Sequence, residues 1–149
     1  MRTNVIDIII QLMRHVRVGE SIDSINSEYL KGYDKSEISA AYSWILQKQQ
    51  SGDLNERMRT RELSAPRRIL HSAERVVITP EAHGYLLEME MLGLIDYQRM
   101  EYIIEQAMLH SIERVTLEKI KDYVSRYAFD SDMNKGSRSV YLQGNESIN

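Results

Sequence analysis

The stretch RVVITPEAHGYLLEMEMLGLID, residues 75–96, decides the fold of this chain. A short β-branched run meets Thr79, Pro80 and Glu81, and the apolar helical pattern that follows ends at Gly93. Thr79 can cap a helix, Pro80 suits its first turn, and Glu81 faces the positive end of the helix dipole. A winged-helix DNA reader would need basic residues after such a strand, where Glu81 stands instead. The stretch therefore predicts the start of a C-terminal helical module.

Two further helices complete this predicted module, which covers residues 79–129. Asp96 can cap the first of them and Thr116 can cap the second. Apolar residues recur in both at spacings of three and four, which is the period of one helix face. From Asp130 onward the chain has few apolar anchors, so residues 130–149 are expected to form a disordered tail.

Residues 1–50 predict an N-terminal module of three helices. Asn4 can cap the first helix, and Ser21 can cap the second. Asp34 and Glu37 have the spacing of a capping box, which begins the third helix. The short turn before the third helix makes the module helix-turn-helix-like. The second helix would bury four apolar side chains, those of Ile22, Ile25, Tyr29 and Leu30.

Residues 51–78 are polar and rich in arginine, and we interpret them as a linker between the modules. Within this linker, the runs RIL and RVVI flank HSAE and could pair as a short hairpin. The turn chemistry is poor for a two-residue hairpin. The fold expected overall is all-α, with two small three-helix modules and at most a short central strand or hairpin.

The length, net charge and composition of the sequence limit the classes of protein to which it can belong. The chain has 149 residues, a net charge of −3 and no cysteine, which excludes disulfides and cysteine nucleophiles. The longest apolar run near the start, VIDIIIQLM, is too short to span a bilayer and is interrupted by Asp7. We therefore expect a cytoplasmic protein that does not insert into a membrane.

The residue types that usually act in catalysis or metal binding form no recognisable motif. The four histidines are scattered, none lies in an H-E-x-x-H motif, and His83 has no metal partner on its helix. Glu101 and Glu105 share a helix face, but a solvated surface is the expected interpretation. Nucleophile motifs and phosphate-binding loops are absent. The sequence thus predicts no catalytic, cofactor-binding or metal-binding residues, no cofactor, and a protein that is not an enzyme.

The arginines form the one concentrated feature. Between residues 57 and 75 the chain has six arginines and only two glutamates, although the whole chain is acidic. These arginines could contact phosphates or an acidic partner, or they could pair with the acidic helices of the protein itself. The nucleic-acid hypothesis is that these arginines bind phosphates while the outward face of the helix expected at 34–50 contacts the bases. The candidate contact residues are Arg57, Arg59, Arg61, Arg67, Arg68 and Arg75.

Tyrosines and methionines gather in the second half of the chain, where the apolar residues exceed what one core face needs. Such a surplus favours docking of a protein partner or of a second copy. The leading hypothesis is therefore a protein-interaction or adaptor module, and nucleic-acid association is the alternative. The candidate partner surface consists of Tyr85, Leu87, Met91 and Tyr97.

Two segments resemble a known family. YLKGYDKSEISAAYSWI (residues 29–45) and RVVITPEAHGYLLEMEMLGLIDYQRMEYIIEQAM (residues 75–108) are similar, in order and spacing, to motifs of the Smg family. The resemblance covers roughly Val5 to Phe129. It implies a cytoplasmic, mostly helical bacterial protein, and it carries over no catalytic or ligand residue. DNA-processing and topoisomerase genes are common neighbours in this family, which is a hint toward nucleic acid by association only.

Overall fold

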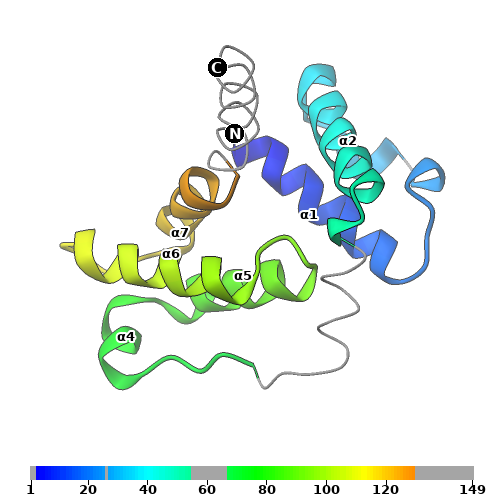
Figure 1. Cartoon of the computed structure of the whole chain (residues 1–149). Helices are drawn as coiled ribbons and strands as arrows, with labels where there is room; N and C mark the ends of the chain where they lie inside the picture. The colour runs from blue at the N-terminus through cyan, green and yellow to red at the C-terminus, as the bar shows by residue number, and fades with distance from the viewer. Residues whose placement is uncertain (1–2, 26, 55–66, 130–149) are drawn as a thin grey trace, which may run out of the picture.

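The computed structural model describes residues 3–25, 27–54 and 67–129, and it contains helices and no strand within these ranges (Figure 1). The all-α prediction is confirmed. The α-helices are α1 (Thr3–Arg17), α2 (Lys35–Gln50), α4 (Ser72–Val77), α5 (Pro80–Met91), α6 (Tyr97–His110) and α7 (Leu117–Val124). Two short 3₁₀ helices, η1 (Ile22–Ser24) and η2 (Ser27–Leu30), and a π-helix, η3 (Ser125–Phe129), complete the set.

Helix α1 begins one residue earlier than the sequence indicates, so Asn4 lies inside the helix and does not cap it. The Asn4 Nδ2 instead donates a hydrogen bond to Glu37 Oε1 of α2 over 3.1 Å. The prediction of Asn4 as a cap was wrong because its amide is used by this contact between helices. The broad apolar stripe does place α1 in the core, where it buries Val5, Ile6, Ile8, Ile9, Ile10, Leu12 and Met13.

The second helix expected from the sequence is wrong, because this segment forms the short turns η1 and η2. The Ser24 hydroxyl donates to the Ser21 carbonyl oxygen over 2.7 Å. Serine side chains of this kind compete with the backbone for hydrogen bonds, which disfavours a continuous helix. Ile22 and Leu30 are buried as expected, whereas Tyr29 is exposed.

Helix α2 begins as predicted. The Asp34 side chain accepts from the backbone of Glu37, and the Asp34 backbone N–H donates to Glu37 Oε2 over 3.2 Å, which forms the reciprocal capping box. Ala41 and Ile45 are fully buried, and the Trp44 ring packs on Phe129 at 5.3 Å between centroids. The residues of the proposed outward face, Lys35, Ser36, Ser39, Ser43 and Gln47, are all exposed.

The hairpin considered for residues 69–78 does not form, and the segment folds as helix α4. The sequence HSAE, which we placed at a turn, is a capping box in which the His71 N–H donates to Glu74 Oε2 over 2.8 Å. Such local satisfaction of backbone groups favours a helix start over a strand turn. Ile78 then makes one isolated parallel bridge to Val115.

The three helices predicted for the C-terminal module are confirmed with their caps. Thr79, Asp96 and Thr116 each occupy the N-cap and accept a backbone hydrogen bond. Gly93 follows α5 with a φ of 74°, a left-handed conformation that glycine adopts without strain.

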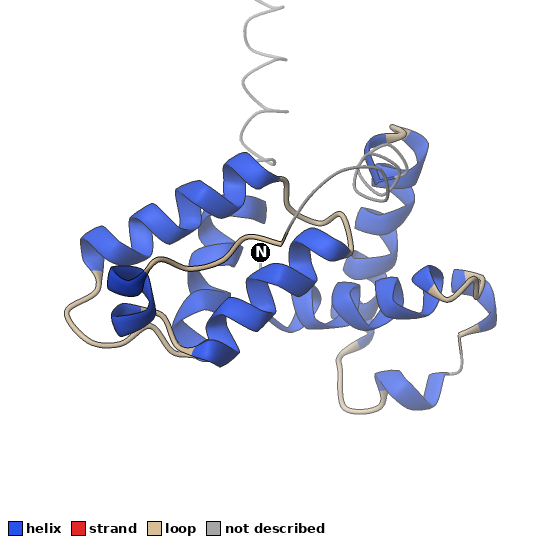
Figure 2. Ribbon diagram, turned by 90° about the horizontal axis from the view of Figure 1, so that it is seen from below, coloured by secondary structure: helices blue, strands red, loops and turns tan. Residues whose placement is uncertain are grey.

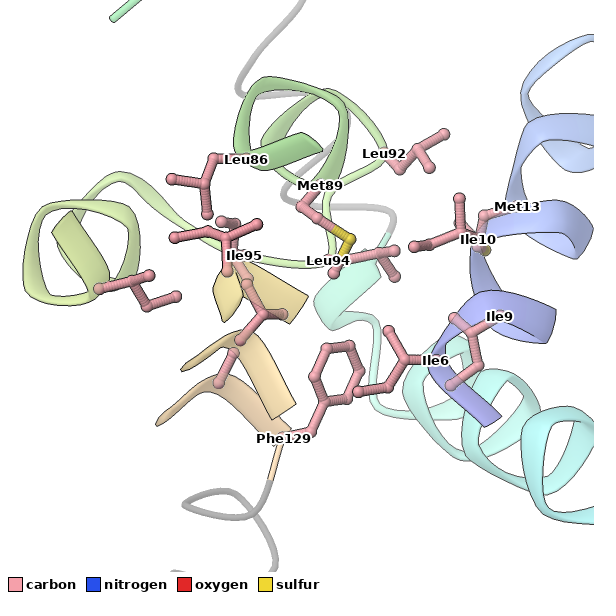
Figure 3. Close-up of a cluster of buried hydrophobic side chains, with 14 of the residues drawn as sticks. Ile6, Ile9, Ile10, Met13, Leu86, Met89, Leu92, Leu94, Ile95 and Phe129 are labelled. Atoms are coloured by element: carbon pink, nitrogen blue, oxygen red, sulfur yellow. The ribbon is translucent and has the colours of Figure 1, made fainter. Parts of the chain in front are cut away.

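The buried side chains of both halves of the chain belong to one hydrophobic cluster. In Figure 3, Ile10 of α1 lies beside Leu94, and Ile6 of α1 lies beside Phe129, both from the second half. Two ion pairs join the halves at the surface, Lys121 to Asp7 at 3.1 Å and Arg14 to Glu88 at 2.6 Å. The tail expected at 130–149 lies outside the described residues.

Candidate functional site

The structure separates the arginines of the predicted cluster. Arg57, Arg59 and Arg61 lie outside the described residues. Arg67 and Arg75 are exposed, whereas the side chain of Arg68 is only 10% exposed. The candidates therefore do not form a uniform basic face in the described part of the chain.

Arg68 is held between two carboxylates of the protein itself. Its guanidinium donates to Glu74 from both terminal nitrogens, at 2.5 and 2.9 Å. It also donates to Glu101 of α6 from Nε at 2.7 Å and from a terminal nitrogen at 3.2 Å. Glu105 is exposed as expected, whereas Glu101 is only partly exposed because it pairs with Arg68, a contact that sequence spacing could not indicate. For Arg68, pairing with the protein's own acidic helices is what the geometry shows.

These contacts shift the ionisation of both partners. The hydrogen bonds from Arg68 lower the pKa of Glu74 to about 2, and the His71 N–H adds to this effect. The hydrogen bonds to Glu74 and then to Glu101 raise the pKa of Arg68 further above its already high value. Arg68 and Glu74 therefore stay charged near neutral pH. We name the cluster of Arg68, Glu74 and Glu101 the Arg68 clamp.

The lowered pKa of Glu74 predicts a loss of stability in acid. Above pH 4.5, the usual value for this group, the folded state benefits fully from the charged carboxylate, and the benefit is lost as pH falls toward 2. We expect the free energy of unfolding to drop by roughly 1–3 kcal/mol over this range on account of Glu74. Urea denaturation at several pH values would measure it. A Glu74→Gln variant should lack this part of the drop, and Glu105→Gln, an exposed carboxylate on α6, should retain it. Equal pH profiles for the two variants would contradict the assignment.

The candidate partner residues of the second half do not share one surface. Tyr85 and Leu87 are partly buried against the core, and because they lie two residues apart on α5 they face different sides. Met91 is also partly buried, whereas Tyr97 is exposed at the start of α6. Burial raises the pKa of the Tyr85 hydroxyl, for which no hydrogen-bond partner is found among the described residues.

A different set of apolar side chains is exposed at one end of the molecule. There α4 lies beside the loop that joins α6 to α7 (Figure 2), and the Ile78–Val115 bridge fastens the two segments together. Large apolar side chains project into solvent from both segments and from the end of α6. We name this set the α4 surface, and it consists of Ile69, Val76, Leu109 and Ile112.

A pocket of about 290 Å³ opens beside the α4 surface. Its apolar lining comes from Ile69, Leu70, Ile78 and Pro80, and its polar lining from Arg75, His83 and Arg114. We refer to it as the α4 pocket. Sequence reasoning missed it because the expected hairpin would have used residues 69–78 in strand pairing, and because the loop holding Arg114 was not considered.

Two other pockets carry charges that already neutralise each other. The larger, of about 470 Å³, lies between the end of α6 and α7, and Lys119 pairs with Glu113 there at 3.6 Å. The other, of about 280 Å³, lies between α1, α5 and α7 and includes the ion pair of Asp7 with Lys121. Among the described residues, no group of three histidine or acidic side chains is placed to hold a metal ion.

The model of a family described as "Protein of unknown function (DUF494)" matches residues 5–140. The chain belongs to this family, whose curated members are named Smg. It is 25% identical to a Smg homolog of Stenotrophomonas maltophilia, over 95% of this chain and 90% of that relative. It is 28% identical to a Smg homolog of Methylococcus capsulatus, over 81% of this chain and 79% of that relative. A Smg homolog of Xylella fastidiosa is 25% identical over 80% and 73%.

These matches confirm the resemblance drawn from residues 29–45 and 75–108. The family match also extends past Phe129, where we placed the end of the resemblance. No solved structure matches this Smg-family chain significantly. None of its described helices is long and apolar enough to cross a lipid bilayer.

Proposed function

We propose that this Smg-family chain is a non-enzymatic protein-interaction module that binds its partner through the α4 surface. The observation that carries the proposal is the exposure of four large apolar side chains on α4, the end of α6 and the adjoining segments, one of which, Ile69, lines the α4 pocket. Isolated apolar side chains are common on protein surfaces, but several that project from neighbouring segments favour a site of interaction. The partner surface expected from the sequence, around Tyr85 and Leu87, offers less exposed apolar area to a partner, because these side chains pack against the core.

The nucleic-acid alternative has weaker support. Arg68, one of its six candidate phosphate contacts, is engaged by Glu74 and Glu101. Sequence-independent binding to nucleic acid depends on many basic contacts to phosphate and needs no exposed apolar group. The exposed Ile69, Val76 and Ile112 therefore favour a protein partner.

Affinity purification from the native cell, with and without nuclease, tests the proposal. We expect a protein partner that withstands nuclease and is lost with the double variant Ile69→Ser/Val76→Ser. Both side chains are largely exposed, so the variant should fold normally. The matched control is Val18→Ser/Leu46→Ser, which replaces two exposed apolar side chains of α2 and the end of α1.

Retention of the partner by Ile69→Ser/Val76→Ser would contradict the α4 surface as the binding site. Loss of the partner after nuclease treatment would instead favour the nucleic-acid alternative. Equal loss with the control variant would mean that binding depends on general surface hydrophobicity.

A further inference from the structure

We infer that the α4 pocket takes one apolar side chain from an acidic segment of a partner protein, whose carboxylates pair with Arg75 and Arg114. This inference rests on the proposed function, and it names the chemistry of the partner. It combines the size of the pocket, its apolar lining and the unneutralised charge at its edge.

The pocket lies at the lower end of the sizes usual for small-molecule ligands, and it is large enough for the side chain of a partner protein. Sites for such ligands usually have volumes of about 300–1,000 Å³ and enclose most of the ligand. The α4 pocket has about 290 Å³ and opens on the surface beside exposed Ile69. An aliphatic or aromatic side chain presented by a protein segment can enter it and cover Ile69, which lines it.

The arginines at this pocket differ from Arg68, because neither has a carboxylate partner among the described residues. The Arg114 guanidinium donates to the Arg75 carbonyl oxygen over 3.4 Å, which holds the two residues on adjoining segments. Within the described part of the chain, no ion pair is formed by Arg75 or Arg114. The acidic residues next to them in sequence pair with other cations, Glu74 with Arg68 and Glu113 with Lys119. The pocket edge therefore keeps a positive charge.

This charge decides between the possible occupants. A symmetric dimer built on the α4 surface would bring the arginines of both copies into one interface and add like charges there. A nucleic acid would satisfy the arginines but would leave the apolar lining unfilled. An acidic protein segment with an apolar anchor satisfies both, because its carboxylates can form charge-assisted hydrogen bonds with the guanidinium groups.

Titration of the full chain with synthetic peptides, followed by NMR of backbone amides, tests the inference. The probe is Gly-Glu-Glu-Leu-Glu-Glu-Gly, and the matched peptides replace Leu by Ser or every Glu by Lys. We expect the first peptide to shift the amide signals of Ile69, Leu70 and Arg75 in a salt-sensitive manner. The Ser peptide should bind at least about tenfold more weakly, because the anchor is lost. The Lys peptide should cause no shifts at this site.

The variant Arg75→Gln/Arg114→Gln should weaken binding of the Glu peptide about tenfold. Arg17→Gln, at an exposed arginine at the end of α1, is the matched control and should leave it unchanged. No shifts at the pocket, or equal binding of the Glu and Lys peptides, would overturn the inference. So would binding of duplex DNA that depends on Arg75 and Arg114, or concentration-dependent dimers in sedimentation that Arg75→Gln/Arg114→Gln strengthens.

Capture of the native partner by the two double variants distinguishes failure of this inference from failure of the proposed function. If Ile69→Ser/Val76→Ser abolishes capture of that partner and Arg75→Gln/Arg114→Gln does not, the surface is correct and the acidic chemistry is wrong. If neither variant affects capture, the proposed function itself is wrong.

Discussion

Replacing Phe129 by Ala will lower the free energy of unfolding by about 3–5 kcal/mol. Phe129 is 2% exposed, and its ring packs against that of Trp44 on α2. Truncation removes buried apolar area and leaves a cavity that the surrounding helices can fill only in part. Because Phe129 ends the π-helix η3 while Trp44 belongs to the N-terminal half, the loss should loosen the contact between the two halves.

Urea denaturation followed by circular dichroism and by fluorescence would measure this effect. Trp44 is the only tryptophan, so its emission reports on the same contact. The matched control is Tyr97→Ala, an aromatic residue that is 61% exposed and should change the stability by less than about 0.5 kcal/mol. A cost for Phe129→Ala no larger than for the control would show that the ring does not link the halves.

The parts of the fold that depend on neighbouring residues could be predicted from the sequence. The caps Thr79, Asp96 and Thr116 and the capping box of Asp34 with Glu37 involve residues at most three positions apart. Their side chains satisfy backbone donors of the next turn, so the residue types alone identify the helix starts.

The errors arose where local signals compete or where a distant contact decides. The serines after residue 20 offered both a helix start and alternative hydrogen bonds, and the second outcome prevailed in η1. The sequence HSAE was interpreted as a turn between strands, although His71 and Glu74 have capping-box spacing. The missing turn chemistry for a hairpin was the signal that could have corrected this.

The candidate site could be predicted less well, because it depends on tertiary contacts. Arg68 and Glu101 are separated by 33 positions, and nothing in either local sequence indicates that they pair. Likewise, Ile69 and Arg114 line one pocket although they are far apart in the sequence. The bridge of Ile78 to Val115 brings their two segments together. Sequence reasoning identified the arginine-rich region as unusual but could not divide it into a structural arginine and accessible ones.

Because Arg68 has a structural role and its neighbours are accessible, we predict that Arg68→Met will lower the free energy of unfolding by about 3 kcal/mol. The change leaves Glu74 and Glu101 facing each other without the cation that neutralises them, and the Glu74 side chain is only 15% exposed. Urea denaturation at neutral pH would measure the loss. Arg67→Met removes the same charge from the neighbouring exposed position, so we expect it to cost less than about 0.5 kcal/mol. Equal effects of the two variants would contradict a structural role for Arg68.

Two further variants test why Arg68 is needed. Arg68→Lys keeps the charge but cannot donate to both carboxylates as a planar fork, so we expect an intermediate loss. Adding Glu101→Gln to Arg68→Met removes one of the stranded carboxylates, and it should recover part of the stability because the main cost of the single change is an unpaired charge. If Glu101→Gln instead made Arg68→Met less stable still, the carboxylates would have other partners, and the Arg68 clamp would not hold α4 and the α4 surface in place.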